Sequence, residues 1–375
     1  MIAREINSCS KNITLRARSY IRRLFYVSYE RCLNVKDICL LVKAEFYKLF
    51  KTKTPYVLFI FIVLLIGGAT YQDYSYHAKM EQLSAQNGEL SSSNDWRQRE
   101  ENTVSYGLEM LDDSSYSPYQ KDQVQRRVEV AQFRLEHDMG HDIDENGWWF
   151  FSSDSFDWVM SLILLFVVIV AVQSVAGEYQ NKTINLWATL PYKRWKLLTA
   201  KLVTTISLGV MALAIVFALG ALSGLLVYGI DNLFINIVLS SATGPYLMSY
   251  PLYVLIILAF KLIEITFFTA LAFLIATLVK STTFATVTAL FTTIFLPPLI
   301  VMASKYYSIL EWLPFNHLDF RKFIDYGRSF PVIEDLFVNV VNPAFPPLTA
   351  ALVVILYLTL LLSITYYAFC RQDIH

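Results

Sequence analysis

Six long runs of apolar residues divide this chain of 375 residues, and they limit its possible folds more than any other feature. The runs cover residues 55–71, 156–175, 202–227, 251–279, 283–303 and 347–370. A helix that crosses a bilayer needs about 20 mostly apolar residues. Composition points the same way, because 55% hydrophobic and 17% charged residues leave little polar surface to cover a water-soluble globule. We therefore predict an all-α membrane protein with six transmembrane helices.

The segments that flank and connect the apolar runs are alternately rich and poor in lysine and arginine. Residues 1–54 hold twelve Lys/Arg against four acidic residues, and residues 178–201 hold five against one. In the other set, residues 72–155 hold seven against seventeen, and residues 229–250 hold none. Basic loops stay on the cytoplasmic side of a membrane. We therefore predict that both termini and residues 176–201 are cytoplasmic, and that residues 72–155 and 304–346 are extracytoplasmic.

The basic connection between the second and third runs reads AGEYQNKTINLWATLPYKRWKLLTAK, residues 176–201. Ile184, Trp187 and Leu190 recur at three-residue spacing, which predicts one apolar edge of a short helix. Pro191 would end this helix, because its ring clashes with the preceding turn and its nitrogen carries no hydrogen. A basic loop with tryptophan is also an ordinary topology anchor. The spacing alone leaves both interpretations open, a docking helix and an anchor.

The order of residues in this connection resembles the second-to-third span connector of ABC type-2 transporter permeases. The matching positions are Glu178, Thr183, Leu186, Leu190, Pro191, Arg194, Leu197 and Lys201. Lys182 stands where glycine is usual in that family, so the turn before the helix departs from the pattern. Residues 40–53, 271–282 and 310–320 resemble further segments of these permeases, and the resemblance covers roughly residues 38–371.

The resemblance implies a permease subunit of a bacterial ABC exporter in the cell membrane. A second permease, identical or a paralogue, would pair with it, and the exported substrate is not readable from the sequence. In that family the connector is a coupling helix that docks on a separate ATPase subunit. The residues to which the resemblance gives this role are Glu178, Thr183, Ile184, Leu186, Trp187, Leu190, Pro191 and Arg194.

No enzyme activity, cofactor, metal site or nucleic-acid partner is expected of this chain. It contains no G-x-x-x-x-G-K-[ST] motif, so ATP hydrolysis is expected on a partner chain. An intramembrane enzyme would need catalytic groups at membrane depth, yet none of the six runs contains a histidine. His137 and His141 lie four residues apart among carboxylates, but two histidines with scattered acids are weak evidence for zinc.

Two connections have their own helical patterns. Before the first run, residues 38–54 predict an amphipathic helix that lies in the membrane interface. Residues 1–37 form a basic extension outside the resemblance. In the loop of residues 72–155, residues 100–111 and a stripe of Val124, Val128, Ala131 and Leu135 predict two helices that could pair.

Lys261 and Glu264 are three residues apart within the fourth run, so their side chains can face each other. Charged residues at membrane depth are rare and are functional candidates by default. We favour a structural or interfacial ion pair. The alternative is an ion-coupled secondary carrier that uses this pair as its relay. In the fifth run, Pro297 and Pro298 predict a kink or a break.

Overall fold

The computed structural model describes residues 35–87, 95–116, 118–139, 147–181, 183, 192–229, 234–241, 244–304, 306–325 and 345–371. Within this part, six segments are helical, long and apolar enough to cross a membrane. They are the Thr54–Tyr76 part of α3 (Thr54–Asn87), α7 (Asp154–Gln180), α9 (Arg194–Tyr228), α10 (Tyr250–Val279), the pair α11 (Thr282–Ile294) and α12 (Leu296–Ser304), and α14 (Pro347–Arg371). The prediction of an all-α membrane protein with six spans is confirmed.

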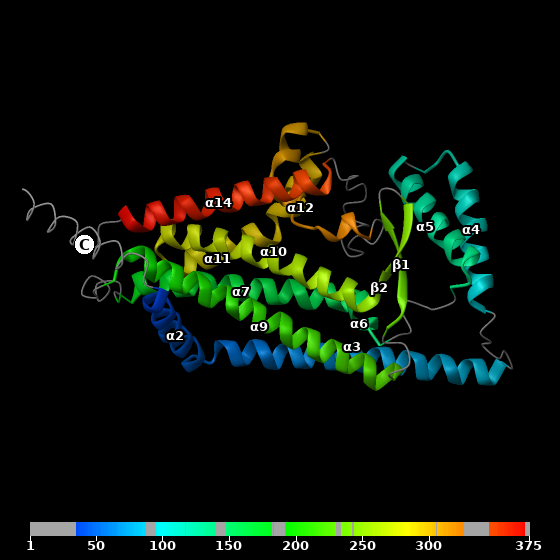
Figure 1. Cartoon of the computed structure of the whole chain (residues 1–375), viewed down its shortest axis with the longest axis horizontal. Helices are drawn as coiled ribbons and strands as arrows, with labels where there is room; N and C mark the ends of the chain where they lie inside the picture. Colours follow the sequence, from blue (N-terminus) through cyan, green and yellow to red (C-terminus); the bar gives the residue numbers. More distant parts are fainter. Residues whose placement is uncertain are drawn as a thin grey trace, which may run out of the picture.

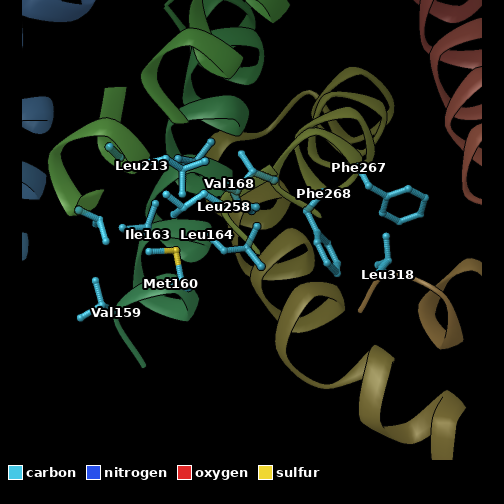
Figure 2. Close-up of a cluster of buried hydrophobic side chains, with 14 of the residues drawn as sticks. Val159, Met160, Ile163, Leu164, Val168, Leu213, Leu258, Phe267, Phe268 and Leu318 are labelled. Atoms are coloured by element: carbon cyan, nitrogen blue, oxygen red, sulfur yellow. The ribbon is translucent and has the colours of Figure 1, made fainter. Parts of the chain in front are cut away.

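Helix α7 lies at the centre of the bundle and contacts α3, α9, α10 and α11. In its most apolar stretch 61% of the residues are buried, the highest share among the six spans. Figure 2 shows side chains of α7, from Val159 to Val168, packed with Leu213 of α9 and Leu258 of α10. A helix that is apolar all round, as α7 is, requires apolar neighbours on every side.

The bundle has two distinct ends (Figure 1). We call one the α2 end, because helix α2 (Val35–Lys51) lies there beside the start of α9 and the end of α7. We call the other the β end, because it carries the strands β1 (Asn236–Ser241) and β2 (Gly244–Ser249) and the starts of α7 and α10. The six spans connect these two ends.

The antiparallel pair of β1 and β2 was not predicted, and it is the main addition to the helical fold. The register joins Asn236 to Ser249 and Ser241 to Gly244. Ile237, Val238 and Leu239 are all buried, so this short apolar stretch packs on both of its faces. Arg126 of α5 donates from Nη1 to the carbonyl oxygen of Ser241 at 2.9 Å, which ties the strands to the neighbouring helix.

The loop after the first span is helical, as predicted. It contains α4 (Asp95–Asp112) and α5 (Pro118–Glu136), which pack against each other beside the β strands (Figure 1). Val128 and Ala131 of the expected stripe are buried. Arg134 of α5 forms an ion pair with Glu100 of α4 at 2.7 Å, so both apolar and charged contacts join the two helices.

Several helices are longer than the apolar runs that predict them. Helix α3 continues to Asn87, well past residue 71, and Tyr228 at the end of α9 donates to Asp73 of α3 at 2.9 Å. Helix α9 begins at Arg194, eight residues before the predicted start at residue 202. Lys196 and Lys201 in this early part of α9 belong to the predicted basic connection, but their side chains are buried and paired with carboxylates.

Two glycines let α9 approach the residues before α7 closely. A Cβ atom on Gly224 would lie 1.8 Å from the carbonyl oxygen of Gly147. A Cβ atom on Gly220 would lie 2.8 Å from ring carbons of Phe150 and Phe151. The four-residue α6 (Trp149–Ser152), whose residues are all buried, therefore packs directly on the α9 backbone.

The fifth span is broken, as Pro297 and Pro298 indicate. Helix α11 ends at Ile294, Phe295 links the two parts, and the two prolines lie in the first turn of α12. Proline fits there because the first turn of a helix does not need its N–H groups for internal hydrogen bonds. The span therefore consists of two helices.

After α12 the chain returns along α10, and we call residues 306–325 the return segment. It contains the 3-10 turns η1 (Ser308–Trp312), η2 (Pro314–Asn316) and η3 (Arg321–Phe323). The Phe315 ring lies 5.9 Å from that of Phe267, and the Phe320 ring lies 5.5 Å from that of Phe260. Because Phe267 is 17 residues into α10 from Tyr250, this contact lies about 26 Å along the helix from its β end.

Candidate functional site

At the α2 end, Glu178 in the last turn of α7 is almost fully buried although it carries a charge. Lys201 of α9 donates to its Oε1 at 3.2 Å, and Lys48 of α2 forms a second ion pair with the same oxygen. Thr183 donates to Oε2 from the connection that follows α7. A buried carboxylate needs such partners, because leaving water without them is very costly.

Lys201 joins Glu178 to helix α2. Its side chain is 1% exposed, and its Nζ lies 2.9 Å from both carboxylate oxygens of Glu45. Two acids, Glu45 and Glu178, therefore face two lysines, Lys48 and Lys201, so the charges balance. The contacts join three elements, α2, α7 and α9, at one point.

A second set of contacts continues along the same face of α2. Lys196 of α9, which is 3% exposed, donates to Asp37 of α2 at 2.8 Å. Leu41 of α2 packs against Leu197 and Ala200 of α9. Asp37, Leu41, Glu45 and Lys48 recur at helical spacing, so one face of α2 contacts the bundle. We call the contacts of this face with α7 and α9 the α2 junction.

At the β end, Lys261 and Glu264 of α10 form an ion pair at 3.0 Å. Lys261 also lies 3.9 Å from Oδ1 of Asp157, in the first turn of α7. The other oxygen of this carboxylate, Oδ2, accepts from Nη1 of Arg321 in the return segment at 3.0 Å. Asp157 therefore lies between two cations that come from different elements.

Arg321 has two further partners in this cluster. Its Nε donates to the hydroxyl of Tyr253 at 3.1 Å, and that hydroxyl donates to Oδ2 of Asp325 at 3.1 Å. Burial alone would lower the pKa of the Arg321 guanidinium, but Tyr253, Asp157 and Asp325 outweigh burial and raise the pKa above its usual value. The guanidinium is therefore charged at every physiological pH.

Comparison with known proteins identifies the family. The family described as "ABC-2 family transporter protein" matches residues 39–374, which is most of the chain. The chain belongs to the ABC-2 transporter family. This ABC-2 permease is a membrane transport component with several membrane spans.

A relative of the permease is found in Bacillus subtilis (strain 168), under the name "Uncharacterized protein YhcI". The two sequences are 28% identical over 138 residues, which is 37% of the permease. The match covers 42% of the relative, so it spans less than half the length of that protein.

Three of the eight predicted coupling residues of the permease lie in the described part of the chain. Glu178 and Thr183 contact each other, and Arg194 is the first residue of α9. Ile184, Leu186, Trp187, Leu190 and Pro191 lie outside the described residues, as do Lys182 and His141. The short docking helix therefore stays a prediction. Among the described residues, no three histidines, cysteines or acids cluster where a metal could bind.

Sequence reasoning missed most partners of the charged residues. It singled out Lys261 and Glu264, but not Asp157 or Arg321, which are 164 residues apart. It used Asp37 and Glu45 only in a charge count, although both pair with buried lysines of α9. One signal was present, since Asp37, Leu41 and Glu45 recur at four-residue spacing and so share one face of α2.

Proposed function

We propose that this permease is the membrane half of an ABC exporter, and that a separate ATPase subunit drives it from the α2 end. The ATPase would dock on residues 176–201, with Trp187 and Leu190 as its main apolar contacts. In this proposal the permease lies in the cell membrane of a bacterium, and both of its termini are on the cytoplasmic side. A second permease, a copy or a paralogue, completes the pathway for a substrate that is exported.

The α2 junction is the observation that carries this proposal. Glu178 lies near the start of residues 176–201 and Lys201 is their last residue, and these two side chains contact each other at 3.2 Å. A force applied to the connection therefore acts on α7 and α9 together. Because α7 is the central helix of the bundle, its displacement reaches every span that packs on it.

Charge supports the proposed sidedness and the docking. The connection carries five basic residues against one acid, and the positive-inside rule favours the cytoplasm for such a loop. The buried members of the α2 junction balance each other, so its charge does not have to be neutralised by a partner. That leaves apolar side chains of the connection, rather than its buried lysines, as the natural anchors for a partner protein.

The test is co-purification of the tagged permease from its native membrane, followed by protein identification and an assay of ATP hydrolysis. We expect an ATPase with the unaltered chain and its loss from the double variant Trp187→Asp with Leu190→Asp. The matched control is Tyr106→Asp, which alters an exposed aromatic residue of α4 at the β end. Retention of the ATPase by the double variant, or its absence from the unaltered chain in several detergents, would refute this docking site.

A further inference from the structure

The return segment is attached to α10 by two kinds of contact. Toward the middle of α10 the contacts are apolar, because the Phe315 ring lies against those of Phe267 and Phe268. Leu318 belongs to the same buried cluster and lies beside Phe267 (Figure 2). Toward the β end they are polar, through Arg321. Apolar and polar contacts differ in how they respond to water, because separated charges regain hydration whereas separated apolar surfaces do not.

The polar contacts join three elements through four residues, Asp157, Tyr253, Arg321 and Asp325. Asp157 comes from α7, Tyr253 from α10, and the other two from the return segment. Tyr253 is fully buried and Arg321 is 8% exposed. Outside these four, Tyr246 of β2 donates to the carbonyl oxygen of Ile324 at 2.8 Å. The last residues of the return segment are thus held from three sides.

A buried ion pair contributes little to the free energy of unfolding when it is compared with apolar residues at the same positions. Replacing a buried pair with apolar residues of similar volume is often neutral or stabilising, whereas removing one partner is costly because the other is stranded. Here the second cation changes that cost. Lys261 already lies 3.9 Å from Oδ1 of Asp157. If Arg321 leaves, Asp157 still has a buried cation beside it.

Arg321 also has a partner that can leave with it. Asp325 follows it by four residues in the same return segment and reaches the same Tyr253 hydroxyl. When this part of the segment lifts, Arg321 and Asp325 enter water together, and Asp157 stays with Lys261 and Glu264. The charges therefore divide into a neutral pair, Arg321 with Asp325, and a group with a net charge of −1, in which Asp157 and Glu264 share Lys261.

We propose that Asp157, Tyr253, Arg321 and Asp325 form a latch that closes the β end of the permease. It opens when Arg321 separates from Asp157, whose charge Lys261 then holds. Lys261 and Glu264 act in this device as positioning residues for Asp157. That the latch gates substrate release rests on the proposed export function, but the opening itself does not.

The experiment measures water access beneath the return segment. Leu318 is 5% exposed, so Leu318→Cys is the reporter, in a chain in which Cys9, Cys32, Cys39 and Cys370 are replaced by serine. The full-length protein in detergent is treated with a water-soluble maleimide, and the labelling rate is measured. Arg321→Gln leaves Asp157 beside Lys261, and we expect it to raise the rate on the order of tenfold, the effect of losing about 1.4 kcal/mol of closure.

A second variant separates a latch from an ordinary structural cluster. The double change Lys261→Met with Glu264→Met removes the group that would hold Asp157 after opening and leaves the net charge unchanged. We expect slower labelling at position 318 than in the reporter background, because opening would strand Asp157. A purely structural cluster predicts the opposite, since loss of any member would loosen the segment and speed labelling.

Two controls keep the test independent of folding and of the ATPase. Arg134→Gln breaks the Arg134–Glu100 pair at the same end and should leave the rate unchanged. Thr205→Cys, a buried position of α9, reports general loosening and should label equally slowly in every variant. The proposal is overturned if Arg321→Gln leaves the rate at position 318 unchanged, if it speeds both reporters equally, or if the double methionine variant labels faster. None of these readouts requires a docked ATPase, so they fail or succeed separately from the docking test.

Discussion

Lys201 of α9 donates to Glu178 of α7 at 3.2 Å, although both side chains are almost completely withdrawn from solvent. The lysine also contacts both oxygens of Glu45, which brings α2 into the same contact. One ammonium group therefore holds together the two helices that flank the basic connection and the helix that precedes the first span.

Lys201→Met tests how much the fold depends on this ammonium group. The change removes the cation between the carboxylates of Glu45 and Glu178, and within the described part of the chain Lys48 and Thr183 still contact Glu178. We expect a loss of about 3–5 kcal/mol in the free energy of unfolding, because a buried charge loses its counter-ion. The measurement is thermal unfolding of the purified protein in detergent.

Lys43→Met is the matched control for this variant, because Lys43 is an exposed lysine of α2. It should change stability by no more than about 0.5 kcal/mol. If Lys201→Met unfolded at the same temperature as Lys43→Met, the α2 junction would contribute nothing to the fold.

Gly224→Ala tests the close approach of α9 to the residues before α7. The new Cβ would lie 1.8 Å from the Gly147 carbonyl oxygen and 2.4 Å from its carbon, so backbone must move. Overpacking of this kind costs about 1–3 kcal/mol and sometimes more. A lower temperature of unfolding in detergent is the expected result.

The comparison for this change is Gly68→Ala in α3, where a Cβ atom would meet nothing within 4 Å. Alanine is the better helix former, so this variant should gain about 0.5–1 kcal/mol. Equal effects of the two substitutions would mean that the close approach at Gly224 is absent in the protein.

His317 makes the return segment sensitive to acid. Burial lowers the pKa of its imidazole below the usual 6.5, and the hydrogen bond with the Glu311 carbonyl oxygen opposes this only in part. The unfolded imidazole therefore takes up a proton at a higher pH than the folded one. The free energy of unfolding should therefore not depend on His317 above about pH 6.5. It should decline as the pH falls from there toward the lower pKa of the folded state.

The check is the temperature of unfolding at several pH values between 7.5 and 5, for the unaltered protein and for His317→Gln. Glutamine keeps a hydrogen-bonding side chain but does not titrate, so the variant should lose less stability on acidification. Identical pH dependence of the two proteins would show that His317 is not responsible.

The six spans could be predicted because a membrane helix is encoded locally, in one uninterrupted apolar run. Polar partners are different, because they meet only after the helices pack. Lys196 and Lys201 belong to the basic connection before the third apolar run, yet their carboxylates lie 159 and 156 residues away in α2. Asp157 and Arg321 likewise come from distant segments, so neither predicts the other.

The β strands were not predicted because their sequence lacks a local pattern that is typical of a strand. Ile237, Val238 and Leu239 form a short apolar stretch that is buried on both faces, so it shows no alternation of apolar and polar residues. Such a run does not by itself distinguish a strand from a fragment of helix. Position 244 has φ +121°, which suits glycine, but a single glycine in a polar stretch is a weak signal for a tight turn.

Helix α9 is one unbroken helix of 35 residues without a proline, about 52 Å long, and it begins at the basic connection. It can therefore behave as a lever. A tilt of about 5° around one end would move the other end by roughly 4–5 Å, about the rise of one helical turn. At its far end Tyr228 donates to Asp73 of α3, so a small rotation of α9 at Arg194 would displace this part of α3 sideways.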